Sequence, residues 1–212
     1  MLSFSTAVSV AVERGAEVIP FPWGDPEAAR QEAEKRGAVA ASPKRTAGQQ
    51  LSLSPASLRQ VGVGTRLLLP SPNGSRLSLA TGESPTFCSC LRNFEAVARA
   101  VRDAAGAGAI AVIPGGERWG DGGLRPAIED WLGAGAVIAA LGGEVSPEAL
   151  TGRLAYEAVR NDLASVLRGS VSGRELIDRG FAGDVEIALE VGRSECAPLL
   201  QNGAYRDSRL MT

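Results

Sequence analysis

The chain has 212 residues, of which 44% are hydrophobic and 22% are charged, and its formal net charge at pH 7 is −2. This composition is typical of a globular protein with one sizeable domain, and the nearly neutral charge gives no electrostatic reason to expect binding to nucleic acid or to an anionic membrane. Because histidine is absent, Ser-His-Asp catalysis, Cys-His catalysis and histidine-ligated transition metals are excluded, which leaves carboxylates, hydroxyls, basic side chains, backbone amides or a hard cation bound by oxygen.

The chain opens with the apolar stretch MLSFSTAVSVAV at residues 1–12, which we interpret as a buried first helix. It resembles a signal peptide only superficially, because no basic residues precede it and Glu13 and Arg14 follow at once. No other stretch approaches the length of a membrane span, and three cysteines cannot form a paired disulfide framework. These features predict a cytoplasmic protein without a membrane segment.

Two short apolar runs, residues 16–22 (AEVIPFP) and 38–42 (AVAAS), predict strands on either side of a helix. Asp25 is the expected N-cap of this helix and Pro26 its first residue, while Gly37 is expected to end it. The alternation of strand and helix predicts a βαβ arrangement.

A turn-rich stretch follows the apolar run 67–69, which predicts a strand buried on both faces. In PSPNGS at 70–75, the prolines hold the backbone extended, Asn73 and Gly74 tolerate positive φ, and Ser75 is the expected N-cap of the next helix. Such a helix N-terminus attracts phosphate or carboxylate. An ordinary strand-to-helix connection explains the same residues, and from this stretch alone it is the favoured interpretation.

The middle of the chain continues the same alternation. TFCSC at 86–90 predicts a strand along which the two cysteines alternate, and a helix is expected from about residue 93 to 107. AIAVIPGG at 109–116 predicts another strand, and residues 126–143 contain an apolar helix rich in small residues. Strands and helices at these spacings predict an α/β fold with a mostly parallel sheet built from βα units.

The strand signals end near residue 143. We expect residues 1–143 to form the βα core and residues 144–212 to form a mainly helical C-terminal region packed on it, within a single domain over residues 1–212. The expected helix caps in this region are Ser146, Asn161, Ser172 and Gly183.

Three loops at predicted strand ends are unusually polar or rich in glycine, namely 71–75, 89–93 and 115–123. Ligands of open parallel sheets bind at the carboxyl ends of the strands, so these loops are candidate walls of one site. If they meet at one edge, they form an anion site in which a carboxylate such as Glu117 could hold Mg²⁺.

The acidic pair Glu129 and Asp130 directly precedes the apolar part of the helix at 126–143. One interpretation places at least one acid where the helix enters the interior, which is costly unless the carboxylate is paired or binds metal. The alternative places both acids in an exposed first turn, stabilised by the helix dipole. The sequence alone does not choose between them.

Taken together, these stretches resemble the 2-phosphosulfolactate phosphatase family, Mg²⁺-dependent enzymes associated with coenzyme M biosynthesis. The resemblance runs nearly end to end and rests on the order and spacing of several motifs. These are SFSTAVSVAVERGAEVIP, LSLSPASL, LLLPSPNGSRL, CSCLRNFEAVARAV, VIPGGER and AIEDWLGAGAVI.

The resemblance implies roles for individual residues. The residues expected to bind the substrate and its phosphate are Ser5, Thr6, Asn73, Gly74, Ser75, Ser89, Asn93 and Arg118. Glu129 and Asp130 match the acidic pair of the family and are the expected catalytic residues, and we expect Glu117 and Asp130 to hold Mg²⁺. The implied reaction is hydrolysis of a small phosphorylated acidic metabolite.

The sequence departs from the family pattern in three places. The family begins with a strand and an aspartate ahead of the first motif, so the chain is expected to be N-terminally truncated. Ser3 replaces an arginine, and ASPKRTAG at 41–48 replaces an acidic loop. These departures favour an alternative, a catalytically impaired relative that binds anions or metabolites, whereas the Asn73–Ser75 turn and the Glu129–Asp130 pair favour the phosphatase, which is the leading interpretation. A missing strand would also leave a sheet edge that a second copy could cover, so a homo-oligomer is a further expectation.

Overall fold

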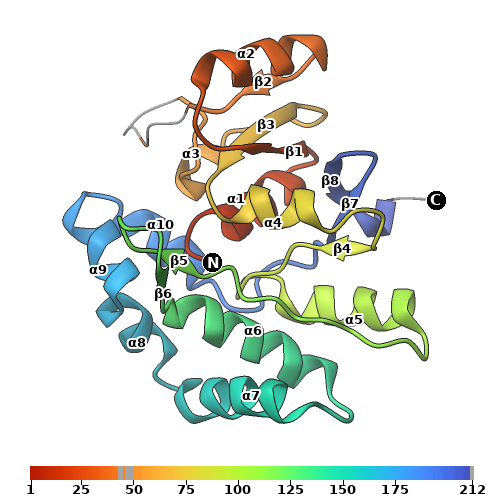
Figure 1. Ribbon diagram of the computed structural model, residues 1–212, viewed down its shortest axis with the longest axis vertical. Coiled ribbons are helices and arrows are strands. Elements are labelled where there is room, and N and C mark those ends of the chain that lie inside the picture. The colour runs from red at the N-terminus through yellow and green to blue at the C-terminus, as the bar shows by residue number, and fades with distance from the viewer. Residues whose placement is uncertain (43–44, 46–49, 211–212) are drawn as a thin grey trace. The chain divides into compact units, whose positions relative to one another are not determined.

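The computed structural model of the protein describes residues 1–42, 45 and 50–210 (Figure 1). The chain divides into two compact units. The sheet unit comprises Ser3–Cys88 and Cys196–Thr212, and the helical unit comprises Met1–Leu2 and Ser89–Glu195. The expectation of a single domain over the whole chain stays a prediction. Among the described residues, no helix combines the length and the apolar character needed to cross a bilayer.

The sheet unit is built on a six-stranded sheet with the strand order β2-β3-β1-β8-β7-β4. Its elements are α1 (Phe4–Glu13), β1 (Glu17–Pro22), α2 (Pro26–Lys35), β2 (Val39–Ala40), α3 (Pro55–Leu58), β3 (Arg66–Ser71), α4 (Gly74–Ala80), β4 (Thr86–Phe87), β7 (Pro198–Gln201), β8 (Ala204–Asp207) and the 3₁₀ turn η1 (Ser208–Leu210). β1 and β2 pair with β3 in parallel, whereas β8, β7 and β4 add antiparallel strands. The α/β class and the parallel core of the sheet are confirmed.

The first half of the sheet unit follows the local rules of its sequence. Leu67, Leu68 and Leu69 of β3 are completely buried, as a strand covered on both faces requires. α1 and α4 pack against β1, while α2 packs against β2 and β3 (Figure 1). α2 begins as predicted, because the Asp25 carboxylate accepts hydrogen bonds from the backbone N–H groups of Glu27 and Ala28 at 2.9 and 3.2 Å.

The C-terminal region differs from the expectation, because β7 and β8 form a hairpin that completes the sheet. The connection between the strands is Asn202-Gly203, and both residues have positive φ, 52° and 75°. Asn-Gly between apolar positions is the strongest short-range hairpin signal, since a two-residue turn of this hand matches the twist of the strands. The interpretation of residues 144–212 as mainly helical overlooked this dipeptide.

Glu17 on β1 forms ion pairs with residues of two neighbouring strands. Their contribution to the stability of the fold can be tested by changing the pH. Its carboxylate accepts hydrogen bonds from Arg206 on β8 at 2.7 and 2.8 Å and from Arg66 on β3 at 3.2 Å. The hydrogen bond from Arg206 is the largest influence, and the pKa of Glu17 lies below its usual value. The carboxylate therefore stabilises the fold at pH values above the unfolded-state pKa, about 4.3, and this contribution is lost as the pH falls through the lower folded-state pKa.

Relative to the parent, Glu17→Gln is expected to lower the free energy of unfolding by about 1 kcal/mol at pH 7. The difference between the two proteins should shrink steadily below about pH 4, where the parent carboxylate also becomes neutral. Urea unfolding of both proteins between pH 7 and pH 3 measures this. A difference that does not change with pH would show that the ion pairs do not contribute.

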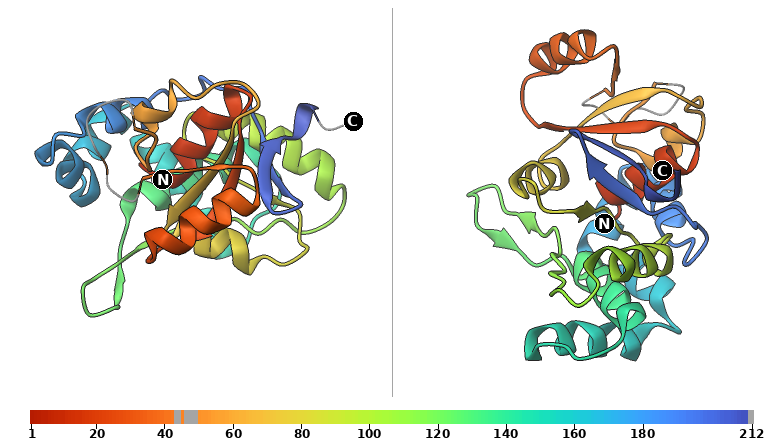
Figure 2. Two further views of the ribbon diagram at one scale, coloured as in Figure 1. Left: turned by 90° about the horizontal axis from the view of Figure 1, so that it is seen from above. Right: turned by 90° about the vertical axis from the view of Figure 1, so that its right-hand side faces the viewer.

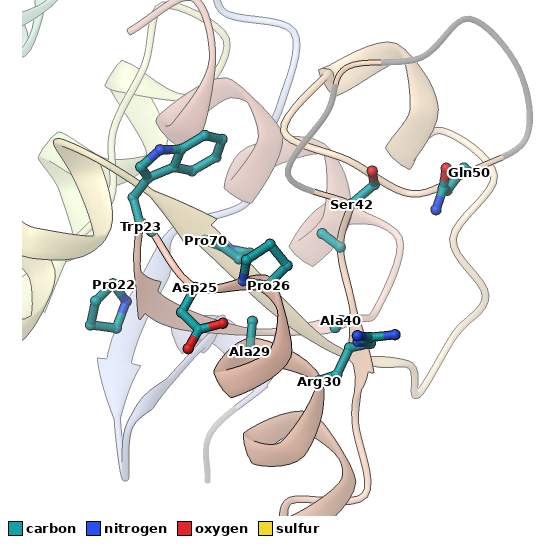
Figure 3. A pocket seen from close by; sticks show the side chains of 12 residues that line it. Pro22, Trp23, Asp25, Pro26, Ala29, Arg30, Ala40, Ser42, Gln50 and Pro70 are labelled. Carbon is teal, nitrogen blue, oxygen red and sulfur yellow. The ribbon is translucent and has the colours of Figure 1, made fainter.

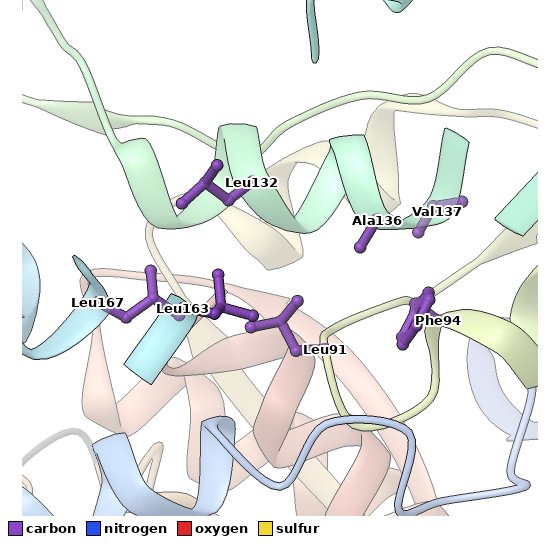
Figure 4. Close-up of a cluster of buried hydrophobic side chains, with 7 residues drawn as sticks. All are labelled: Leu91, Phe94, Leu132, Ala136, Val137, Leu163 and Leu167. Atoms are coloured by element: carbon purple, nitrogen blue, oxygen red, sulfur yellow. The ribbon is translucent and has the colours of Figure 1, made fainter. Parts of the chain in front are cut away.

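The helical unit contains most of the helices and a two-stranded sheet. Its elements are α5 (Phe94–Ala105), β5 (Glu117–Arg118), β6 (Leu124–Arg125), α6 (Ile128–Leu141), α7 (Pro147–Val159), α8 (Leu163–Gly169), α9 (Val171–Asp178) and α10 (Ala182–Ala188). In Figure 2 (left) the β5–β6 hairpin extends as a narrow green arm. The core of the unit packs Leu132, Ala136 and Val137 of α6 against four side chains from other elements (Figure 4). These are Leu91, Phe94, Leu163 and Leu167.

Two predicted strands of the middle region are wrong or shortened. Residues 109–116, all of them described, form no strand, and Ile110 and Ile113 are exposed because no neighbouring strand pairs with the segment. β4 ends at Phe87, so Cys88 and Cys90 lie beyond it and are buried in the following turn rather than alternating along a strand. An apolar run is therefore not sufficient to make a strand here.

The C-terminal helices begin close to their predicted caps but mostly not at them. Ser146 caps α7 as predicted, since its hydroxyl accepts from the Ala149 N–H at 3.2 Å. The residues preceding α8, α9 and α10 are Asp162, Ser170 and Phe181, not Asn161, Ser172 and Gly183. Ser170 is the effective cap of α9 because its backbone is extended and its hydroxyl accepts from the Gly173 N–H at 3.0 Å.

Candidate functional site

The turn between β3 and α4 is built by side-chain contacts to its own backbone. The Ser71 hydroxyl accepts from the Gly74 N–H at 3.2 Å, and the buried Ser75 hydroxyl donates to the Leu69 carbonyl at 2.9 Å. Asn73 is the residue preceding the helix, so the prediction of Ser75 as N-cap is wrong. The helix begins earlier because Ser71 supplies an acceptor for its first N–H group.

Gly74 brings two predicted motifs of the sheet unit together. A Cβ atom at Gly74 would lie 2.2 Å from Cδ1 of Phe4, so only glycine lets the turn pack on the first residue of α1. Ser5 and Thr6 follow Phe4 in the first turn of α1, and Thr6 is fully buried. The hydroxyl residues of the first motif and the Asn-Gly-Ser turn therefore lie on neighbouring elements.

Arg45 is the one basic residue of the loop after β2 that lies within the described part of the chain. Its guanidinium donates a hydrogen bond to the hydroxyl of Ser3, the position that the family resemblance assigns to arginine. Of ASPKRTAG at 41–48, residues 43–44 and 46–48 lie outside the described residues. The loop thus brings one guanidinium to the start of α1.

A pocket of about 290 Å³ lies where β1, β2 and β3 end, the edge at which open parallel sheets bind ligands. Figure 3 shows Trp23 on one side of this pocket and Ser42 and Gln50 on the other. Neither Asn73 nor Ser75 lines it. The pocket lies at the sheet edge where the sequence predicts a site, but sequence reasoning did not name Trp23, which directly follows β1.

In the helical unit, the turn before α5 holds Ser89 and Asn93. Asn93 precedes the helix as predicted, and its side-chain oxygen accepts from the Cys90 N–H at 2.9 Å, which closes the turn. The Ser89 hydroxyl is buried and has no hydrogen-bond partner among the described residues. A buried hydroxyl of this kind is costly unless a ligand or water satisfies it.

Glu129 and Asp130 are both buried, which agrees with the first of the two interpretations drawn from the sequence and contradicts the exposed first turn of the second. They lie in the first turn of α6, where the helix dipole favours carboxylates, and they are only 3% and 8% exposed. The Met1 nitrogen donates a hydrogen bond to Asp130 Oδ1. On the other side, a Cβ atom at Gly115 would lie 3.4 Å from Asp130 Oδ2, so the backbone of the 109–116 segment passes beside this carboxylate.

The β5–β6 hairpin carries Glu117 and Arg118. Glu117 lies opposite Arg125 across the two strands. Arg118 is exposed, and its guanidinium donates to the Gly122 carbonyl in the hairpin turn at 2.7 Å. Arg118 therefore supports the turn in this structure, in addition to the substrate contact expected of it.

Arg125 is a buried arginine that sequence reasoning missed. Hydrogen bonds to Glu175, followed by the charges of Glu175, Glu117 and Glu129, raise the pKa of Arg125, while burial acts in the opposite direction. Arg125 lies opposite Glu117 in the hairpin and four residues before Glu129, so it is close in the chain and in the hairpin to two acids of the candidate site. No local signal identified it, because its main partner Glu175 lies 50 positions away in the sequence.

The acids of the helical unit fit a hard cation by their chemistry. Asp130, Glu129 and Glu117 offer carboxylate oxygens, which Mg²⁺ prefers. Within residues 1–42, 45 and 50–210, no group of three or more acidic or cysteine side chains is already gathered around a point that could hold a metal ion. Mg²⁺ commonly uses one or two carboxylates and completes its shell with water and substrate phosphate, so two of these three carboxylates are sufficient.

The predicted site residues thus fall into two sets. Ser5, Thr6, Asn73, Gly74 and Ser75 belong to the sheet unit, whereas Ser89, Asn93, Glu117, Arg118, Glu129 and Asp130 belong to the helical unit. The expectation that the three polar loops follow strands of one parallel sheet is wrong. Only the 71–75 loop follows a parallel strand, because residues 109–116 form no strand and β4 pairs antiparallel with β7.

Comparison with known proteins places the whole chain in one family. A family model described as 2-phosphosulpholactate phosphatase matches residues 1–203. Over 212 residues the chain is 31% identical to a protein of Methanothermobacter thermautotrophicus (strain Delta H) named 2-phosphosulfolactate phosphatase, covering 99% of this chain and 86% of that relative. Both matches confirm the resemblance seen in the motifs. The chain belongs to the 2-phosphosulfolactate phosphatase family.

Proposed function

We propose that this protein is a metal-assisted phosphatase that hydrolyses 2-phosphosulfolactate, or a closely similar small acidic phosphate ester, to the hydroxy acid and inorganic phosphate. The observation that carries the proposal is the end-to-end match to a relative named for this activity. The buried acidic pair Glu129 and Asp130 supports it, because clusters of buried ionisable groups are candidates for reactive sites. We include a cytoplasmic location and self-association in the proposal.

We assign Mg²⁺ as the cation and Asp130 and Glu117 as its ligands. When bound, Mg²⁺ polarises the phosphate ester and offsets the charge that develops as the P–O bond breaks. We assign Glu129, the neighbour of Asp130 in the first turn of α6, as the base that accepts a proton from the attacking water. Water then contributes its oxygen to phosphorus as the ester oxygen leaves with the hydroxy acid.

The remaining predicted residues are assigned to the anionic groups of the substrate. Ser5, Thr6 and the Asn73–Ser75 turn offer hydroxyl and amide donors, and Arg45 adds a guanidinium at the start of α1. Ser89 supports a similar assignment in the helical unit, because its buried hydroxyl has no partner within the described part of the chain. Gly74, Asn93 and Arg118 are assigned to the same binding function.

Asn73→Ala tests the anion-binding part of this proposal. The substitution is expected to weaken binding of inorganic phosphate roughly tenfold, because it removes one hydrogen bond to a charged group. The substitution removes no side-chain cap hydrogen bond of α4. Isothermal titration calorimetry gives the affinity directly.

Asn161→Ala, at an exposed position before α8, is the matched control and should bind phosphate like the parent. Equal affinity of the Asn73 variant and the parent would remove Asn73 from the site. The alternative of an impaired, anion-binding relative is not favoured, because the whole-length match is to a protein named as an enzyme.

A further inference from the structure

Arg125 connects the β5–β6 hairpin to helix α9. Its guanidinium donates to both carboxylate oxygens of Glu175, from Nη1 at 2.7 Å and from Nη2 at 3.3 Å, and Nη2 also donates to the Ser172 hydroxyl at 3.2 Å. Glu175 and Ser172 lie three residues apart and therefore on the same side of α9. This two-point contact fixes the orientation of the guanidinium as well as its position.

The regular backbone pairing of the hairpin is short. β5 and β6 contain two residues each and pair only with one another within the described residues. A two-stranded hairpin is marginally stable in water unless it packs on another element. The segment 109–116 that leads into it has no regular hydrogen-bonded structure. Arg125, only 9% exposed, is the buried side chain through which the hairpin contacts α9.

Stability alone is a poor explanation for this arginine. Arg125 Nε is buried and has no hydrogen-bond partner among the residues described, so part of the guanidinium is unsatisfied. Glu175 is about half exposed, and ion pairs of this kind contribute little net stability because solvent screens the attraction between the charges. Trp119, from the same hairpin, lies under the guanidinium with 5.6 Å between Arg125 Cζ and the ring centroid. The contact is better suited to fixing where the hairpin lies.

The position of the hairpin sets the position of Glu117 relative to the other acids of the proposed site. Glu117 faces Arg125 across the hairpin, and Glu129 lies four residues beyond Arg125, at the start of α6. Movement of the hairpin would therefore move Glu117 relative to the Glu129 and Asp130 pair.

We propose that Arg125, held by Glu175, is a positioning residue of the phosphatase site: it fixes the β5–β6 hairpin so that Glu117 stays within reach of Glu129 and Asp130. The proposal rests on the proposed function, because Glu117 matters only if these acids bind the metal. Arg125 itself does not contact the reacting atoms. Outer partners that orient metal ligands typically affect metal affinity by about 10- to 100-fold.

Glu175→Gln is the direct test, because it keeps the shape of the side chain and removes the charge that holds Arg125. The Mg²⁺ concentration for half-maximal phosphate release should rise about tenfold or more, with a smaller effect on the turnover number at saturating Mg²⁺. Mg²⁺ affinity is also measured without turnover, by the Mg²⁺-dependent shift of the melting temperature. Arg125→Lys, which keeps the charge but loses the two-point contact, should give the same direction of change.

Trp119 provides a separate view of the hairpin. With Trp23 and Trp131 replaced by phenylalanine, Trp119 is the remaining tryptophan of the chain. Its quenching by acrylamide should increase in Glu175→Gln, because the guanidinium that covers one face of the ring is no longer held. This measurement does not depend on any enzymatic activity.

Glu186→Gln is the matched control. Glu186 makes a similar two-point contact with Arg168, at 2.8 and 2.7 Å, but both side chains are about half exposed and join α8 to α10. This variant should change neither the Mg²⁺ response nor the quenching of Trp119.

Higher Mg²⁺ requirement together with increased quenching, in Glu175→Gln but not in Glu186→Gln, would support the proposal. An unchanged Mg²⁺ response in Glu175→Gln would overturn it while leaving the proposed function intact. Absence of any Mg²⁺ response in the parent protein would overturn the metal part of the proposed function, and the positioning role with it. The parent therefore distinguishes the two failures.

Discussion

Asp130→Asn is expected to lower phosphate release by at least about 100-fold and to abolish the Mg²⁺-dependent rise in melting temperature. Asparagine keeps the shape of the side chain but loses the negative charge that a hard cation requires. A loss of 100-fold corresponds to about 2.7 kcal/mol of transition-state stabilisation, which is within the range expected for disrupting a metal site. Steady-state kinetics and thermal melts with and without Mg²⁺ measure the two effects.

Asp103→Asn is a suitable control, because Asp103 is an exposed acid on α5 outside the proposed site. It should retain the activity and the Mg²⁺ response of the parent. If Asp130→Asn melts with the same Mg²⁺ response as the parent, Asp130 is not a metal ligand.

Gly135→Ala is expected to destabilise the helical unit by about 3 kcal/mol or more. Gly135 lies on α6 where this helix crosses α7, and a Cβ atom there would be 2.1 Å from the Gly152 carbonyl oxygen. Backbone cannot move aside as a flexible side chain can, so the helices must separate or α6 must shift. For a chain of this length the melting temperature should fall by roughly 6 to 12 °C.

The control for this substitution is Gly183→Ala in α10, where a Cβ atom would meet nothing within 4 Å. Alanine favours the helix over glycine by up to about 1 kcal/mol, so this variant should be as stable as the parent or slightly more stable. Differential scanning calorimetry compares the two variants. Equal melting temperatures for the parent and Gly135→Ala would show that the close approach of α6 and α7 is not required.

The parts of the fold that the sequence predicted are those decided locally. Asp25 and Pro26 start a helix by satisfying its first N–H groups, and three consecutive leucines at 67–69 make a strand covered on both faces. Predictions from local sequence were wrong where strand formation depends on pairing with a distant strand. Residues 109–116 are as apolar as a buried strand, yet no strand pairs with them.

The residues of the candidate site likewise include some that local sequence indicates and others that only the folded chain reveals. The acidic pair was recognised because two carboxylates before an apolar helix are unusual, and the structure decides for the buried placement that the sequence left open. Arg125 was missed because its significance comes from Glu175, which only the folded chain brings near. The dipeptide Asn202-Gly203 is typical of a two-residue β-hairpin turn, so the β7–β8 hairpin could have been predicted from the sequence. Roles for individual residues followed from family resemblance, and they stay predictions until variants are measured.

Phosphate release from 2-phosphosulfolactate by the parent chain, first with Mg²⁺ and then with excess EDTA, is the measurement to make first. We expect steady turnover with Mg²⁺, loss of turnover with EDTA, and recovery when Mg²⁺ is restored. Absence of turnover with Mg²⁺, from protein that still binds inorganic phosphate in calorimetry, would contradict the assignment of this chain as a phosphatase.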